Sequence, residues 1–186
     1  MDLGLLLLRI ALAAILYMHS TQKLFGWFSG PGLERQGKVF HGLGHRPGRP
    51  LAMLAAACEA SGSLLVVIGL ATPLGAAVIA GTMIVAGMTL TFAKRTVWNV
   101  AGGGEYPLVL ATFAVVLGFA GPGRWSLDSA IGAPWYPKSN AAAAVTGVIV
   151  LVVALLAAIP PLLRVRANLA ADAAAEPAPP ATSVST

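Results

Sequence analysis

The fold of this chain is indicated by one stretch, Leu51-Ala-Met-Leu-Ala-Ala-Ala-Cys-Glu-Ala-Ser-Gly-Ser-Leu-Leu-Val-Val-Ile-Gly-Leu-Ala71. The stretch is apolar except for small residues and one ionisable side chain, Glu59, in its middle. A helix of about 20 apolar residues can cross the hydrocarbon core of a bilayer, so the stretch predicts a membrane-spanning helix. A carboxylate at that depth is costly unless it is neutralised or paired. Glu59 is therefore the first candidate for a functional residue.

The composition of the whole chain is that of a membrane protein. Of its 186 residues, 57% are hydrophobic and 10% are charged, and the mean hydropathy is +0.79. About a quarter of the residues of a soluble domain are charged. The net charge of +5 comes from lysines and arginines scattered around apolar runs, so we expect no nucleic-acid binding. The single cysteine, Cys58, excludes an internal disulfide and a CxxC redox motif within this chain.

Five apolar segments predict an all-α bundle of membrane-spanning helices. They cover residues 3–25, 51–71, 74–93, 106–120 and 141–163, and the fourth is short for a span. Pro160 and Pro161 are predicted to end the fifth helix. The Ala- and Pro-rich residues 167–186 predict a disordered tail. Between the first two spans, the glycine-rich residues 26–50 predict a basic loop that lies on the lipid headgroups.

The distribution of lysine and arginine predicts the orientation in the membrane. Nine of them lie on one side of the predicted spans: Lys23, Arg35, Lys38, Arg46, Arg49, Lys94, Arg95, Arg164 and Arg166. Only Arg124 and Lys138 lie on the other side. Because basic residues are enriched in cytoplasmic loops, we expect the N-terminus outside and the C-terminus in the cytoplasm. Arg9 falls inside the first span, and its side chain is expected to extend toward the outer interface, near Asp2 or Asp128.

A polar pocket is expected around Glu59. His19, Gln22 and Lys23 are spaced by three and four residues, so they share one face of the first helix. Glu59 lies roughly 12 Å into the second helix from the same side of the membrane. The loop before the fourth span also lies on that side. The candidate binding residues from this argument are His19, Gln22, Lys23, Glu59, Asn99 and Glu105.

Two interpretations of Glu59 remain open at this stage. A neutral Glu59 could relay a proton, and an ionised one would need a basic partner such as Lys23. Alternatively, Glu59 only holds helices together through a buried ion pair. No metal site is predicted, because His41 and His45 have no further ligand set nearby.

Three stretches give the chain a family resemblance. They are His19-Ser-Thr-Gln-Lys-Leu-Phe-Gly-Trp-Phe-Ser-Gly-Pro-Gly32, Cys58-Glu-Ala-Ser-Gly62, and Gly103-Gly-Glu-Tyr-Pro-Leu108, the last followed by Gly121-Pro-Gly-Arg-Trp-Ser-Leu-Asp128. In this order they resemble the DoxX family of small bacterial membrane proteins, over roughly residues 5–130. Ser20 departs from the glycine that is usual after the histidine, and we expect it to crowd the helix packing slightly.

The resemblance implies a four-helix membrane domain over residues 1–130 in the bacterial plasma membrane, with the fifth helix outside it. It adds Tyr106 to the candidate site, beside His19, Lys23, Glu59 and Glu105. Relatives in the wider group include the small subunit of a thiosulfate:quinone oxidoreductase. Some members are thought to join membrane complexes with a superoxide dismutase and a sulfurtransferase.

The leading hypothesis is a membrane subunit of a quinone- or sulfur-linked redox complex. It would bind a quinone headgroup in the polar pocket, with Glu59 as the best candidate for a catalytic, proton-carrying residue. The sequence has no cofactor motif, so electrons would come from a partner. One alternative is a small proton-coupled transporter, and another is a scaffold that recruits a peripheral enzyme through the basic first loop. Whether the chain forms a homo-oligomer stays open.

Overall fold

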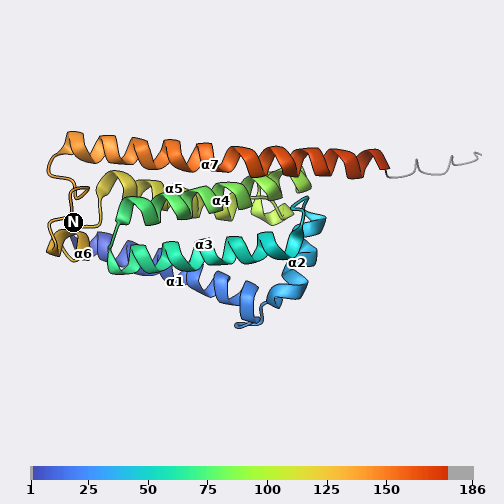
Figure 1. Cartoon of the computed structure of the whole chain (residues 1–186), viewed down its shortest axis with the longest axis horizontal. Coiled ribbons are helices and arrows are strands. Elements are labelled where there is room, and N and C mark those ends of the chain that lie inside the picture. Colours follow the sequence, from blue (N-terminus) through green and yellow to red (C-terminus); the bar gives the residue numbers. More distant parts are fainter. Residues whose placement is uncertain (1, 176–186) are drawn as a thin grey trace, which may run out of the picture.

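The computed structural model describes residues 2–175, and within them four helices are long and apolar enough to cross a membrane (Figure 1). They are α1 (Asp2–Phe25), α3 (Gly48–Ile68), α4 (Thr72–Lys94) and α7 (Asn140–Ala175). A fifth apolar helix, α5 (Glu105–Ala120), has 16 residues and is about 24 Å long, shorter than these four. The described residues contain no strand, so the predicted all-α membrane bundle is confirmed.

Three short helices connect the long ones. They are α2 (Gly32–Gly42), the 3-10 helix η1 (Asn99–Ala101) and α6 (Leu127–Ala130). The presence of α2 corrects the expectation of a plain loop over residues 26–50. It packs against the start of α3, where Gly37 lies so close to the Arg49 backbone that an added Cβ would be 2.9 Å from the Arg49 Cα. The exposed rings of Trp27 and Phe28 precede it, and such rings favour the membrane interface.

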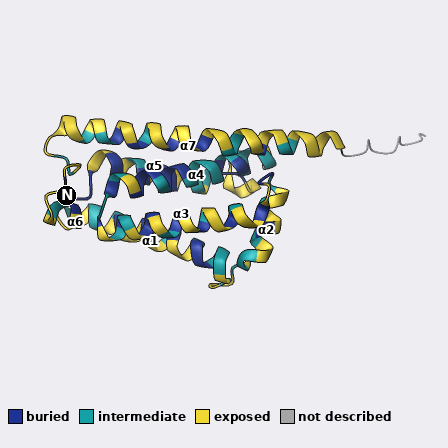
Figure 2. Ribbon diagram, in the orientation of Figure 1, coloured by how far each residue is buried: buried dark blue, intermediate teal, exposed yellow. Residues whose placement is uncertain are grey.

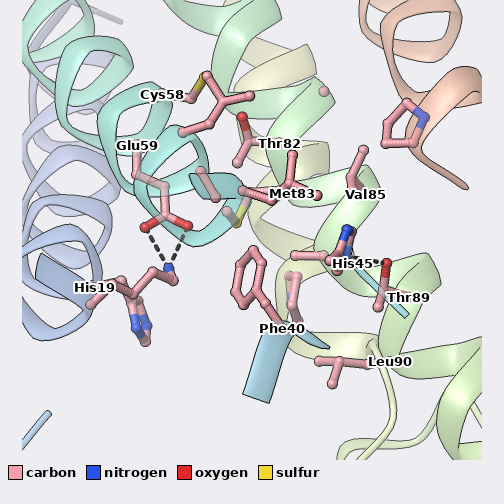
Figure 3. Close-up of a pocket in the computed structure, with 18 of the residues that line it drawn as sticks. His19, Phe40, His45, Cys58, Glu59, Thr82, Met83, Val85, Thr89 and Leu90 are labelled. Atoms are coloured by element: carbon pink, nitrogen blue, oxygen red, sulfur yellow. Dashed lines mark hydrogen bonds and ion pairs between the residues drawn. The ribbon is translucent and has the colours of Figure 1, made fainter. Parts of the chain in front are cut away.

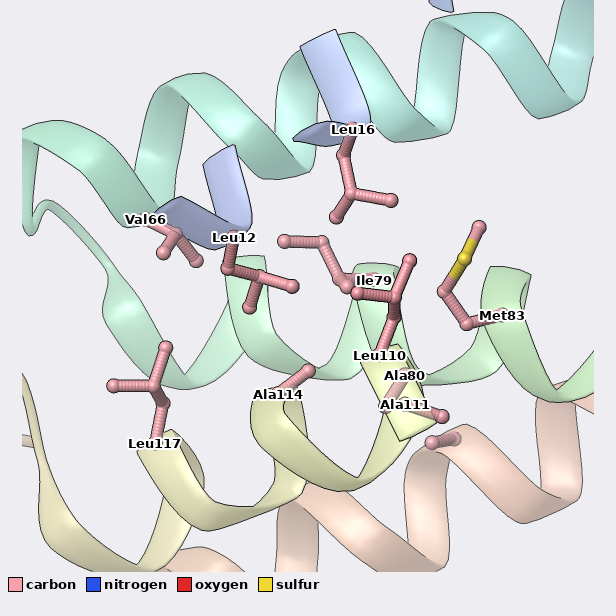
Figure 4. Packing of buried hydrophobic residues seen from close by; sticks show 11 residues of the cluster. Leu12, Leu16, Val66, Ile79, Ala80, Met83, Leu110, Ala111, Ala114 and Leu117 are labelled. Atoms are coloured by element: carbon pink, nitrogen blue, oxygen red, sulfur yellow. The ribbon is translucent and has the colours of Figure 1, made fainter. Parts of the chain in front are cut away.

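The core lies between α1, α3, α4 and α5. Large apolar side chains from these four helices meet there (Figure 4): Leu12, Leu16, Val66, Ile79, Leu110 and Leu117. Small residues set the close approach of α4 and α5, because a Cβ on Gly104 would overlap the Gly87 carbonyl oxygen. The outward faces of the helices remain exposed (Figure 2) and are apolar, as a bilayer requires.

Arg9 is buried, which contradicts the expectation that its side chain extends outward. Its residue exposure is 1%, and its guanidinium donates to four backbone carbonyls. Two belong to Val66 and Val67 near the end of α3, each at 2.8 Å. The others belong to Pro122 at 2.9 Å and Trp125 at 2.8 Å, in the α5–α6 connection. The carbonyls at a helix end lack intrahelical partners, and a planar donor with five N–H groups satisfies several at once.

The two carboxylates expected near Arg9 have other partners. Asp128 is fully buried and accepts hydrogen bonds from the backbone N–H groups of Ala71 at 2.8 Å and Thr72 at 2.9 Å. It therefore neutralises the N-terminus of α4. Asp2 forms an ion pair with Arg124 at 2.9 Å. Together with Arg9, these contacts fix one end of the bundle.

The helix α7 runs through Pro160 and Pro161, so the prediction that these prolines end it is wrong. Ala158 and Val165, before and after the prolines, are both buried. Packing on both sides holds the helix together although each proline removes one backbone hydrogen bond, a loss that membrane helices tolerate. The first nine residues of the predicted disordered tail, 167–175, are helical, and the remainder of that tail, 176–186, lies outside the described residues.

Beyond the bundle, α7 reaches the connection between α2 and α3. Asn168 donates from its side-chain amide to the Gly44 carbonyl at 2.8 Å. Arg46 forms an ion pair with Asp172 at 2.6 Å. The last turns of α7 therefore hold the segment that carries His45.

Candidate functional site

The central feature of the site is an ion pair between α1 and α3. The Lys23 ammonium donates to both carboxylate oxygens of Glu59, at 2.6 and 2.5 Å. The exposed fractions of the two side chains are 17% for Lys23 and 3% for Glu59. Glu59, inside the second predicted span, therefore has a basic partner on the first helix. This partner is Lys23, the residue suggested for an ionised Glu59.

A serine fixes α1 against α3 next to this ion pair. Ser20, which replaces the usual family glycine, is 1% exposed and donates from its hydroxyl to the Ala56 carbonyl at 3.0 Å. Ser63, one turn beyond Glu59, donates to the Glu59 carbonyl at 2.6 Å. Instead of only crowding the packing, Ser20 adds a buried hydrogen bond between the two helices.

The ion pair lies on the wall of a cavity of about 540 Å³ (Figure 3). The cavity reaches from α1 and α3 across α4 to α5 and α7, and α2 borders it. Most of its wall is apolar, with these residues prominent among them: Val39, Phe40, Leu43, Leu51, Leu54, Ala55, Val78, Met83, Val85, Leu90, Leu110 and Pro161. An apolar cavity with a few polar groups in its wall is the usual form of a small-molecule site.

Two aromatic rings extend the polar part of the cavity. His19 and Tyr106 both line it, and their ring centroids are 5.9 Å apart in an edge-to-face arrangement. His19 comes from α1 and Tyr106 from the first turn of α5, at the place where Gly104 brings α5 close to α4. Of the seven candidate residues, the structure thus brings four to the cavity wall, namely His19, Lys23, Glu59 and Tyr106.

The other three candidates lie elsewhere. Gln22 does not line the cavity, and its side-chain amide donates to the Phe28 carbonyl at 3.3 Å. The Glu105 carboxylate accepts from the Asn99 backbone N–H at 3.0 Å, at an exposed position. These contacts stabilise the turn after α1 and the turn before α5.

The cavity residues that were not sequence candidates include His45, Thr89 and Cys58. His45, in the α2–α3 connection, forms a hydrogen bond of 3.1 Å between its Nε2 and the Oγ1 of Thr89 on α4. The half-buried Cys58 lies in the cavity wall beside Glu59. The sequence offered a signal for His45 only through its spacing from His41, which does not line the cavity. In residues 2–175, no group of three or more His, Cys, Asp and Glu side chains could hold a metal ion.

Burial affects the protonation of His45. The residue is 8% exposed, and its ring lies against Phe40 with centroids 5.1 Å apart. Desolvation lowers the pKa of the His45 imidazole below its usual value of 6.5. The ring is therefore neutral at neutral pH, with one nitrogen able to donate and the other able to accept.

The fold and the site define a multi-pass, all-α membrane protein with an amphipathic cavity. The family model for DoxX matches residues 4–92, which run from α1 nearly to the end of α4, and this match supports the assignment of that part of the chain to the DoxX family. The matched region contains Lys23, Glu59, His45 and Thr89. No curated protein and no solved structure matches the chain.

Proposed function

We propose that this protein is a membrane subunit of a redox complex and that its cavity binds a lipid-soluble quinone. The observation that supports this most is the Lys23–Glu59 ion pair on the wall of a largely apolar cavity between helices that are long and apolar enough to cross a membrane. A quinone has an apolar ring and chain that suit this wall, and carbonyl oxygens that need a hydrogen-bond donor. Membrane-embedded ionisable pairs of this kind often mark pathways of substrates or protons.

The ion pair has the groups that quinone chemistry requires. A lysine ammonium has three hydrogens, and two point to the Glu59 oxygens, which leaves one for a ligand carbonyl. Glu59 can take up a proton and pass it to the reduced oxygen, with Lys23 and His19 also in the cavity wall. In a complex, a partner would oxidise two thiol groups to a disulfide. The two electrons and two protons released would convert the quinone to the quinol.

The partner and the location are part of the same proposal. The resemblance to DoxX proteins suggests a peripheral enzyme such as a superoxide dismutase or a sulfurtransferase, at a bacterial plasma membrane. The exposed basic side chains of Arg35 and Lys38 on α2 offer such an enzyme a surface for docking. With these residues in the cytoplasm, the N-terminus would lie outside and the C-terminus inside.

The test is purification from native membranes in mild detergent, followed by solvent extraction and quantification of bound quinone. We expect wild type to retain quinone and Glu59→Gln to lose it. Glu34→Gln is the matched control, because Glu34 forms an ion pair with Arg49 that is exposed and outside the cavity. If wild type contains neither quinone nor a redox enzyme, the proposal is wrong, and proton-coupled transport should then be tested by flux into liposomes.

A further inference from the structure

We propose that His45 is a second hydrogen-bonding residue for the cavity ligand, which therefore carries an oxygen at each of two opposite edges of its ring. This inference rests on the proposed function and specifies the ligand class further, to para-quinones and para-quinols. It also assigns a role to a residue in the α2–α3 connection, outside the membrane-spanning helices.

The first support is the placement of His45 relative to the ion pair. Both His45 and Glu59 line the cavity, and Figure 3 shows them on opposite sides of it, with Phe40 between them. Most of the cavity wall is apolar, and Figure 3 shows Met83 between the two polar positions as well. A flat ring with a polar atom at each end fits such a cavity better than a molecule with one polar end.

The second support is the hydrogen-bonding state of the imidazole. Its Nε2 is paired with the Thr89 hydroxyl, but its Nδ1 has no hydrogen bond within the described residues, 2–175. Although the residue is more than nine-tenths buried, Nδ1 is not among the fully buried atoms without a partner in the described residues, so it retains some accessible surface, and His45 lines the cavity. A ligand in the cavity is a suitable partner for Nδ1.

The Thr89 hydroxyl lets the imidazole serve either oxidation state of the ligand. When Thr89 donates to Nε2, the ring proton is on Nδ1, which can donate to a quinone carbonyl. When Nε2 donates to Thr89, Nδ1 is free of a proton and can accept from a quinol hydroxyl. No change in the net charge of the site is needed, because the imidazole is neutral in both tautomers.

The third support is the rigid mounting of His45. Both neighbours of His45 in the chain are held by α7. The Gly44 carbonyl accepts from the Asn168 amide, and Arg46 forms an ion pair with Asp172. The His45 backbone N–H donates to the Phe40 carbonyl at 2.9 Å. Binding residues need such support, because a loosely held side chain loses affinity to conformational entropy.

The experiment compares two probes that differ by one hydroxyl. Decylhydroquinone has two para hydroxyls, and the phenol with the same decyl chain has one. Their dissociation constants are measured by isothermal titration calorimetry on the full chain in mild detergent under reducing conditions. One buried hydrogen bond corresponds to about a tenfold difference in affinity. We expect wild type to prefer decylhydroquinone by about that factor and His45→Leu to lose the preference.

Controls separate binding from folding. His41→Leu alters an exposed histidine outside the cavity and should keep the wild-type preference. His45→Gln retains a donor and an acceptor, so it should keep part of the preference for decylhydroquinone. This variant replaces His45→Leu in the comparison if His45→Leu does not fold. If wild type binds both probes and His45→Leu keeps the preference, this inference is wrong while the proposed function stands. If wild type binds neither probe, both are wrong.

Discussion

The Lys23–Glu59 pair permits a test that separates a structural role from a functional one. At 2.5 Å and an effective dielectric constant of about 20, the attraction between the two charges is roughly 7 kcal/mol, which is an upper limit. Lys23→Met leaves a nearly fully buried carboxylate without a partner, and removal of one member of a buried pair costs about 3–5 kcal/mol. Glu59→Leu should cost less, because the Lys23 side chain is 17% exposed and lies near the end of α1, where it can turn toward water.

The double variant Lys23→Met/Glu59→Leu removes both charges and should be close to wild type in stability, since apolar replacement of a buried pair is often neutral. Thermal unfolding in detergent measures all four proteins. Lys23→Met should lower the Tm by about 10 °C and the double variant by much less. If the double variant is destabilised by the sum of the single effects, the two charges are not coupled. If it is stable and still retains quinone, the pair is only structural.

Three further outcomes are expected. Arg9→Lys should lower the Tm by about 5 °C or more, because an ammonium with three donors cannot satisfy four carbonyls. The control Arg124→Lys, in an exposed ion pair with Asp2, should change the Tm little. Folding lowers the pKa of His45, so below about pH 6.5 the unfolded chain binds more protons than the folded chain. The Tm should therefore fall on acidification. Thermal scans of both proteins should show a smaller fall for His45→Asn than for wild type. A cysteine at Ser29, in a Cys58→Ala background, should resist a membrane-impermeant maleimide added to intact cells, and labelling from outside would reverse the proposed orientation.

The residues that the sequence analysis missed share a physical reason. His45 and Thr89 are 44 positions apart, and no local period relates them, so only the packing of the α2–α3 connection on α4 reveals the pair. The same holds for Arg9, whose four acceptors are backbone carbonyls of α3 and of the α5–α6 connection. Backbone acceptors have no signature in the sequence, because every residue has one.

The prediction for α7 failed for a related reason. A pair of prolines lowers the local stability of any helix, and the sequence shows that cost directly. The compensation comes from Ala158 and Val165, which are buried on either side of the prolines, and from contacts of Asn168 beyond them. Tertiary packing outweighs the low helix propensity of the two prolines here. The packing partners lie far away in the chain, so a short segment of sequence does not identify them.

The sequence by itself determined that the chain is an all-α membrane protein, because the length and hydropathy of a span are local properties set by the thickness of the bilayer. It also singled out Glu59, because a charge in an apolar run is costly wherever the run packs. Only the tertiary structure decided that Lys23 is its partner, that the pair lines a cavity, and that His45 lies on the opposite side. Those facts depend on how helices rotate and approach one another, which is fixed by contacts between residues far apart in the chain.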